Sequence, residues 1–169
     1  KTASDSTMLS KEANGAIFDQ IKKNAIFKEE KKITVNYNPQ SVVADMDGKT
    51  LYVCSWDTYD METYDVISAS KLQKVDIASG KVSDMDSYAD VKCIVEGPDN
   101  KMLVALGGYD AEWHVCGSVK VIDMKDGSDK GLLFKDQIVN YYSLSYSGGY
   151  VFVGASDYKT NGDVYMYKA

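Results

Sequence analysis

The chain has 169 residues, of which 44% are hydrophobic, and this content argues against intrinsic disorder because it can bury a core. Thirteen tyrosines, thirteen glycines and only two prolines favour strands and turns over helices, so we expect an all-β protein. The formal net charge of −6 and the scattered lysines argue against a nucleic-acid partner, which needs clustered positive charge.

The chain opens with a predicted tail at residues 1–14. Residues 15–36 are then expected to form two strands, the third and fourth of a preceding repeat unit, with a Lys-Lys-Asn turn between them. An alternative prediction makes residues 10–23 a helix, because Ile17, Phe18 and Ile21 would lie on one face. Gly15 argues against that helix, since glycine is unfavourable inside one.

Three later segments are similar to one another. They begin at residues 47, 99 and 147 and read DGKTLYVCSWD, DNKMLVALGGYD and SGGYVFVGASDY. Each is a turn leading into an apolar strand, and each is followed by a second matching strand, SKLQKVDIASGK, GSVKVIDMKDG or GDVYMYK. Taking Leu51, Leu103 and Val151 as equivalent gives spacings of 52 and 48 residues, and Leu72, Val119 and Val164 are the matching positions in the second strand. This period is typical of the blades of a β-propeller.

Period-two alternation and turn residues divide each unit into strands a to d. The first unit covers residues 37–86, with strands at 41–46, 50–55, 71–77 and 81–85. The second covers 87–136, with strands at 91–96, 102–107, 118–124 and 131–135. The third covers 137–169, with strands at 141–146, 150–155 and 164–168, and it lacks strand d. We therefore expect a single domain, a partial β-propeller of about three four-stranded antiparallel blades.

Closure of the predicted propeller needs more than this chain supplies, because complete propellers have typically four to eight blades. We expect additional N-terminal blades or another chain to complete the ring and cover the exposed strand edges. Closure by a dimer of two identical chains is less favoured, because the strands of two copies do not divide evenly into four-stranded blades.

The two ends of the predicted blades differ in composition. In antiparallel blades the b–c and d–a connections emerge at one end, and the a–b and c–d turns at the other. The turns hold Gly, Asp, Asn and Lys, whereas the b–c connections at 56–70, 108–116 and 156–162 are longer and aromatic. Aromatic side chains with a polar tip suit recognition of ligands and protein surfaces. The predicted ligand-binding residues are Trp56, Tyr59, Tyr64, Tyr109, Trp113, His114, Tyr141 and Tyr158. The alternative is that these aromatics only pack the loops onto the blades.

Metal and nucleotide chemistry receive little support. Asp57, Asp60, Glu62 and Asp65 could surround Ca²⁺, but their spacing does not match an EF-hand, so we expect a solvated acidic loop. His114 is the only histidine, which leaves no multi-histidine site. No glycine-rich phosphate loop precedes a helix, so we predict no metal, no cofactor and no nucleotide enzyme.

The cysteines form an odd set without CxxC spacing. Cys54, Cys93 and Cys116 are each expected in or beside a strand, as small apolar residues. A single disulfide among them is the alternative.

The segment NPQSVVADMDGKTLYV at residues 38–53, with VDIASGKV at 75–82, resembles the YVTN-type β-propeller repeat family of bacterial surface proteins. The similarity covers roughly residues 17–169, although the later units replace the Asn-Pro start of strand a and have longer b–c connections. The closing GASDYKTNGDVYMYKA is also similar to the end of propeller lipoproteins from Bacteroidetes, some of which capture cobalamin at the cell surface. This resemblance implies a location at the outer-membrane surface or in the periplasm, with a lipid anchor on the full-length form. No segment has the eighteen or so consecutive apolar residues of a membrane span.

Three functions follow from these expectations. The first is a non-enzymatic module that binds a small molecule or an outer-membrane protein through its aromatic b–c loops, with cobalamin-like nutrient capture as one form. The second is a propeller enzyme, similar to lactonases or quinoproteins, with a site in the central channel that would use Asp45, Asp90 and Glu96. The third is a purely structural repeat without a pocket.

Overall fold

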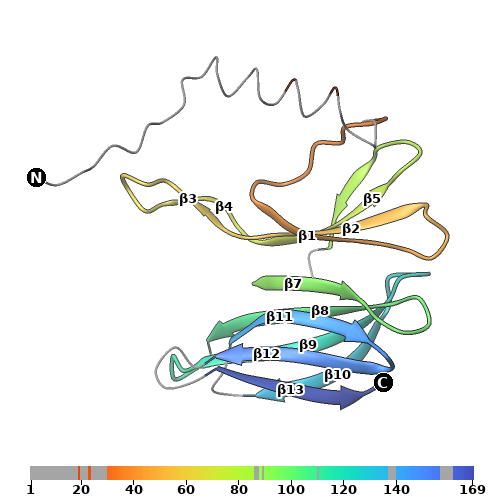
Figure 1. Cartoon of the computed structure of the whole chain (residues 1–169). Helices are drawn as coiled ribbons and strands as arrows, with labels where there is room; N and C mark the ends of the chain where they lie inside the picture. Colours follow the sequence, from red (N-terminus) through yellow and green to blue (C-terminus); the bar gives the residue numbers. More distant parts are fainter. Residues whose placement is uncertain are drawn as a thin grey trace, which may run out of the picture. The chain divides into compact units, whose positions relative to one another are not determined.

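The computed structural model describes residues 30–85, 88, 90–109, 111–136, 140–156 and 162–169, together with Asp19 and Lys23. The chain divides into two compact units, Lys1–Ile33 and Thr34–Ala169, and every strand described belongs to the second (Figure 1). The all-β class expected from composition is confirmed, because the strands form antiparallel sheets of two to four strands. The strand pair predicted at 15–36 and the alternative helix at 10–23 lie largely outside the described residues. Residues 30–36 form no strand.

Sheet 1 contains four strands in the order β1-β2-β5-β6. Their bounds are Pro39–Ala44, Thr50–Ser55, Lys71–Asp76 and Val82–Asp84. These are strands a to d of the first predicted unit, with their ends displaced by up to two residues. The long connection between β2 and β5 forms a hairpin that was not predicted, made of β3 (Thr58–Tyr59) and β4 (Val66–Ser68), and it extends away from sheet 1 in Figure 1.

Sheets 2 and 3 repeat the pattern. Sheet 2 has the order β7-β8-β9-β10, with bounds Val91–Glu96, Lys101–Tyr109, Val115–Asp123 and Asp129–Asp136. Sheet 3 has the order β11-β12-β13, with bounds Asn140–Ser147, Tyr150–Ser156 and Gly162–Lys168. Within the part of the chain that the structure describes, no fourth strand joins β13.

Two hairpin turns show why glycine, aspartate and asparagine recur between strands a and b. Asp99 and Asn100 both have positive φ, 53° and 56°, and so do Gly148 and Gly149, at 58° and 77°. Two consecutive residues with positive φ form the turn that matches the right-handed twist of two-residue hairpins, and these residue types tolerate it.

A β-bulge near the start of strand a recurs in all three sheets and fixes which positions are equivalent. The pairs directly after the bulges are Ser41 with Cys54, Cys93 with Ala105, and Ser143 with Gly154. On the neighbouring strand c the partners are Leu72, Val119 and Val164, so the predicted equivalence of these three residues is confirmed.

The predicted equivalence of Leu51 and Leu103 is wrong by one residue. Ala44 pairs with Leu51, whereas Glu96 pairs with Met102, so the connection in sheet 2 is one residue shorter. Met102 is therefore the counterpart of Leu51. Alternate residues of a strand point to opposite faces of the sheet. The corrected alignment therefore places Met102 and Leu103 on opposite faces of sheet 2, one facing sheet 1 and the other facing sheet 3.

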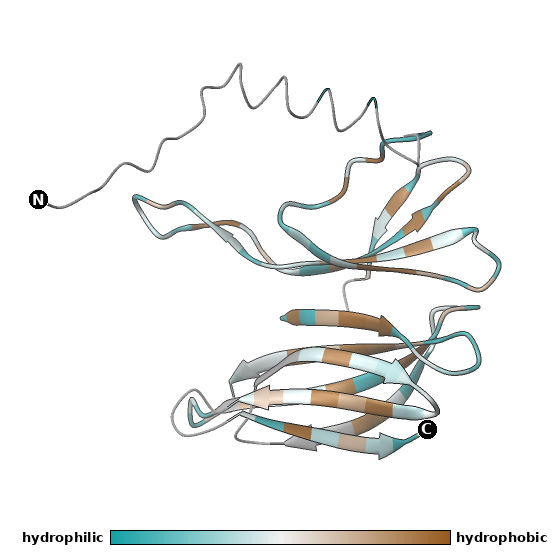
Figure 2. Cartoon of the chain, viewed as in Figure 1, coloured by the Kyte–Doolittle hydropathy of each residue, from teal (hydrophilic) through white to brown (hydrophobic). Residues whose placement is uncertain are grey.

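The core has two layers, one on each face of sheet 2. The first contains Tyr52, Cys54 and Leu72 of sheet 1 against Met102, Val104 and Ile122 of sheet 2. The second contains Leu103, Ala105 and Val119 of sheet 2 against Val151, Val153 and Ala155 of sheet 3. Tyr52, Cys54 and Leu72 are equivalent to Leu103, Ala105 and Val119, so sheets 1 and 2 use the same face to contact the sheet that follows them. Each contact therefore joins that face to the other face of the next sheet. Figure 2 shows the apolar residues concentrated in the strands, while the connections are largely hydrophilic.

Candidate functional site

A pocket of about 140 Å³ lies where the connection after β2 meets the start of β7. Its lining residues are Trp56, Asp57, Tyr59, Ser70, Asp90, Val91 and Lys92. The first four come from the connection between β2 and β5 of sheet 1. Asp90 directly precedes β7 of sheet 2, and Val91 and Lys92 are the first two residues of that strand. The pocket therefore lies at the end of the sheets where the sequence placed the aromatic connections, and two of the predicted residues, Trp56 and Tyr59, line it.

Trp56 joins the two connections. It follows directly after β2, and its indole Nε1–H donates to the backbone carbonyl oxygen of Lys92 across 2.5 Å. Its backbone N–H donates to the carbonyl oxygen of Asn38. These two bonds hold the indole in place, while 38% of the residue stays exposed. The ring is thus fixed in orientation and still accessible to a ligand.

Asp57 closes the base of the long connection. One carboxylate oxygen accepts the backbone N–H of Ser70 at 2.6 Å, and the other accepts the hydroxyl of Tyr59 at 3.3 Å. The negative charge of Asp57 is the main reason that the pKa of Tyr59 is raised above its ordinary value. Tyr59 therefore keeps its proton, and its phenol is available as a hydrogen-bond group at the pocket.

Asp90 and Lys92 form an ion pair within the pocket lining. The Lys92 Nζ lies 2.6 Å from Oδ1 of Asp90, with side-chain exposures of 22% and 32%. Asp90 has a φ of 54°, in the left-handed region that aspartate tolerates better than most residues. Its backbone carbonyl accepts the N–H of Gly107, which fixes this turn against sheet 2.

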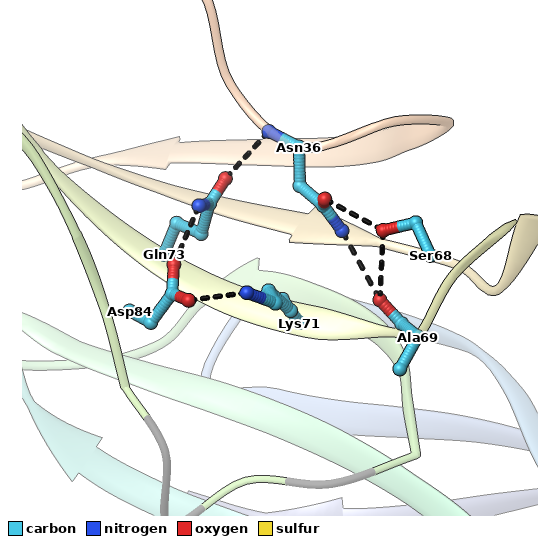
Figure 3. Close-up of polar contacts among 6 residues, drawn as sticks. All are labelled: Asn36, Ser68, Ala69, Lys71, Gln73 and Asp84. Carbon is cyan, nitrogen blue, oxygen red and sulfur yellow. Dashed lines mark hydrogen bonds and ion pairs between the residues drawn. The ribbon is translucent and has the colours of Figure 1, made fainter.

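A polar network fixes Ser68 and Ala69, the two residues that precede Ser70 (Figure 3). The Asn36 amide donates to the carbonyl oxygen of Ala69 at 3.1 Å and accepts from the hydroxyl of Ser68 at 2.8 Å. The backbone N–H of Asn36 donates to the side-chain oxygen of Gln73 at 2.8 Å. Asn36 thereby holds the returning end of the β3–β4 connection against sheet 1.

Gln73 connects that network to the edge strand β6. Its Nε2 donates to Oδ1 of Asp84 at 2.7 Å, and the other Asp84 oxygen pairs with the Lys71 ammonium. These two partners, Lys71 first, hold the pKa of Asp84 below its ordinary value. Gln73 is buried, and a buried polar group needs hydrogen-bond partners. Its amide oxygen has one in the Asn36 N–H, and its amide nitrogen has one in Asp84.

The β3–β4 hairpin carries the acidic residues that the sequence offered as calcium ligands. Asp60 instead accepts the backbone N–H groups of Glu62 and Thr63, which shapes the turn and lowers the pKa of its carboxyl. Among the residues that the structure describes, no group of three potential metal ligands is gathered. Tyr64 lies in this connection, exposed and with a φ of 62°, and it does not line the pocket.

None of the remaining predicted residues whose side chains the structure describes lines the pocket. Tyr109, the last residue of β8, and Trp113, in the β8–β9 connection, form a tilted aromatic pair with ring centroids 6.0 Å apart, and both are exposed. His114 is exposed beside them. Tyr141 is in β11, where only its backbone is described, and Tyr158 lies outside the described residues. The structure therefore unites Trp56 and Tyr59 and separates Tyr109 and Trp113 from the pocket lining.

Sequence reasoning missed the polar half of the pocket. Asp90 was considered only for a channel site, and Lys92 and Ser70 were not considered. The signal in the sequence is that Asp90 and Lys92 flank the start of a predicted strand a, at the same end of the predicted sheets as the aromatic connections. The three cysteines lie in β2, β7 and β9, and all are free thiols.

Comparison with protein-family models and with curated proteins finds no match for the chain. Among the described residues, no helix has the length and apolar character that crossing a membrane requires.

Proposed function

We propose that the three sheets are blades of a β-propeller and that the chain is a non-enzymatic binding module whose site is the pocket between Trp56 and Lys92. Three features support the propeller: the a-to-d strand order, the bulge at the same place in each sheet, and the packing of each sheet through opposite faces. A stack built in this way can continue by adding further sheets to either end.

One observation carries the binding function: the pocket joins aromatic and charged residues from two successive repeats. Pockets that bind small molecules combine an apolar or aromatic wall with a few placed polar groups. Here Trp56 and Tyr59 form the wall, and Asp90 with Lys92 supplies the polar groups. A volume of about 140 Å³ holds one small ring, so a ligand as large as cobalamin would be held by the exposed loops outside it.

The enzymatic alternative is less well supported by the geometry. Asp90 lies before β7 and Glu96 ends it, so the six-residue strand separates them. Asp45 follows β1 at the same end as Glu96, and its carboxylate accepts the backbone N–H groups of Lys49 and Thr50. The three carboxylates therefore do not converge on one substrate, and two of them already have structural partners.

The outer face of sheet 3 supports the proposal that further blades or another chain complete the ring. Leu72 and Val119 are 1% and 0% exposed at the two contacts between sheets, whereas the equivalent Val164 is 73% exposed. Met166 on the same face is also exposed, and β13 is an edge strand. Exposed apolar faces and long edges are usually covered in proteins. With the YVTN resemblance, we propose a bacterial surface or periplasmic location.

The two tryptophans allow a direct test of the binding site. A ¹⁵N–¹H spectrum contains two indole N–H signals, and the Trp113→Phe variant identifies the one from Trp56. We expect members of a small-fragment library, screened at millimolar concentration, to shift the Trp56 signal and to lose this effect when Asp90 and Lys92 are both replaced by alanine. A library that leaves the Trp56 signal unmoved would place the function elsewhere.

A further inference from the structure

We infer that the pocket binds an uncharged pyranose ring, such as the terminal sugar of a glycan. This inference rests on the proposed function, because it names the ligand class of the same site. Three properties of the lining lead to it: how its charges are satisfied, how its aromatic rings are held, and how its remaining polar groups are placed.

Every charged group in the pocket already has an internal partner. Lys92 is paired with Asp90 at 2.6 Å, and both oxygens of Asp57 accept hydrogen bonds, from Ser70 and from Tyr59. An anionic ligand would have to compete with Asp90 for the ammonium group. A cationic ligand would have to compete with Lys92 for the carboxylate. Breaking a partly buried pair leaves one charge uncompensated, so the site favours a neutral ligand.

Net charge weakens the case for an anion further. The lining holds two aspartates and one lysine, and the whole chain carries a formal charge of −6. Such a field lowers the local concentration of phosphates and carboxylates. A wholly apolar ligand is also disfavoured, because it would cover polar atoms of Asp90, Lys92 and Ser70 without giving them hydrogen bonds.

The aromatic wall suits a ring with one apolar face. The Trp56 indole is held by its bond to the Lys92 carbonyl, and the Tyr59 ring is held through its hydroxyl by Asp57. Rings fixed in this way lose little conformational entropy when a ligand binds. The C–H groups on one face of a pyranose carry partial positive charge, and they pack well on the negative face of an aromatic ring.

The Asp90–Lys92 pair in the lining suits the hydroxyl-bearing edge of the same ring. An adjacent carboxylate and ammonium present an acceptor beside a donor, and neighbouring hydroxyls of a sugar can each donate to one and accept from the other. Hydrogen bonds to ionised groups are stronger than neutral ones, and these bonds form without breaking the Asp90–Lys92 pair. The Ser70 hydroxyl and the Tyr59 phenol add further groups of the kind that sugars use.

The test uses the complete chain and six named probes. D-glucose, D-galactose, D-mannose and N-acetyl-D-glucosamine are titrated to tens of millimolar while the Trp56 indole N–H signal is followed. Choline chloride and sodium acetate serve as the cationic and anionic probes. We expect at least one sugar to shift the signal in a saturable way and neither ion to do so. Lys92→Met should reduce the affinity for that sugar about tenfold, because it removes roughly one hydrogen bond between the chain and the sugar.

Lys120→Met is the matched control, because Lys120 forms a similar pair with Asp129 at 2.7 Å outside the pocket lining. Its sugar affinity should equal that of the unmodified chain. Saturation by choline or acetate, with no response to any sugar, would overturn the ligand class and leave the site intact. A sugar response that Lys92→Met does not weaken would overturn the role of the ion pair. Failure of all six probes and of the fragment library would overturn the proposed function itself.

Discussion

The indole N–H of Trp56 donates to the backbone carbonyl of Lys92, a residue 36 positions later in the chain. This bond joins the end of β2 in sheet 1 to the start of β7 in sheet 2. The aromatic wall and the polar wall of the pocket are therefore positioned by one contact between successive repeats. The pocket exists only when both sheets are folded and packed, so the proposed ligand binding requires a stable contact between sheets 1 and 2.

Trp56→Phe keeps an aromatic ring and removes the N–H. The Lys92 carbonyl then loses its donor, and we expect the free energy of unfolding to fall by about 1 kcal/mol. Urea denaturation measures the change. Trp113→Phe is the control, since Trp113 is 81% exposed, and its effect should stay within about 0.5 kcal/mol. Equal effects of the two substitutions would contradict a structural role for the Trp56 bond.

Gln73→Ala removes the buried amide between Asn36 and Asp84. The Asn36 N–H loses its acceptor and Asp84 loses a donor, so we expect about 1–3 kcal/mol of destabilisation. Gln40→Ala on β1 is the control, because Gln40 is exposed and its side-chain amide donates to Asn38, two residues away in the chain. Hydrogen exchange at Ala69 and Ser70 should also rise in Gln73→Ala, and unchanged protection there would argue against the network's role in holding this connection.

Val119→Ala and Val164→Ala compare the same substitution at equivalent positions. Val119 is buried between sheets 2 and 3, and losing two methyl groups should cost about 2 kcal/mol. Val164 is exposed, so its substitution should stay within about 0.5 kcal/mol. Both values come from chemical denaturation of the isolated chain. A cost at Val164 as large as at Val119 would show that its face is already covered.

The carboxyl of Asp84 should make stability depend on pH in a predictable direction. Lys71 and Gln73 lower its pKa below the ordinary value of 3.8, so the native state favours the ionised form. Its stabilising contribution is complete above pH 3.8 and is lost as the pH falls through the lower native pKa. Carboxyl ¹³C titration should show the Asp84 pKa rising in Lys71→Met. It should stay unchanged in Lys74→Met, which alters the opposite face of β5.

The thiols of Cys54 and Cys93 should react slowly in the native chain. Burial raises the pKa of Cys54 to about 11 and that of Cys93 to about 12, and only the thiolate is nucleophilic. Iodoacetamide at pH 8, followed by peptide mass spectrometry, should modify both residues rapidly in guanidinium chloride and hardly at all in buffer. Fast native labelling of either residue would contradict its position in the packed layers.

The strands and their order could be predicted from the sequence because the signals are local. Side-chain alternation and the Asp-Asn and Gly-Gly turns act over a few residues, and their recurrence along the chain showed which strands are equivalent. The same signals identified the end of the sheets that carries Trp56 and Tyr59. The one-residue error at Leu103 arose because the turns Asp47-Gly48-Lys49 and Asp99-Asn100-Lys101 have similar sequences, although the connection in sheet 2 is one residue shorter. The all-β class could therefore be predicted from the sequence, whereas the alignment of sheet 2 with sheet 1 could not.

The sequence by itself determined an antiparallel, repeated β architecture with aromatic b–c connections. Only the tertiary structure decided which of those aromatics form a pocket. Asp90 and Lys92 meet Trp56 through a contact between two sheets, and no short-range pattern encodes such a meeting. The β3–β4 hairpin likewise depends on Asp57 and Asn36 closing its base across long stretches of chain. Local periodicity specifies strands, whereas the pocket depends on which faces and ends of those strands pack together.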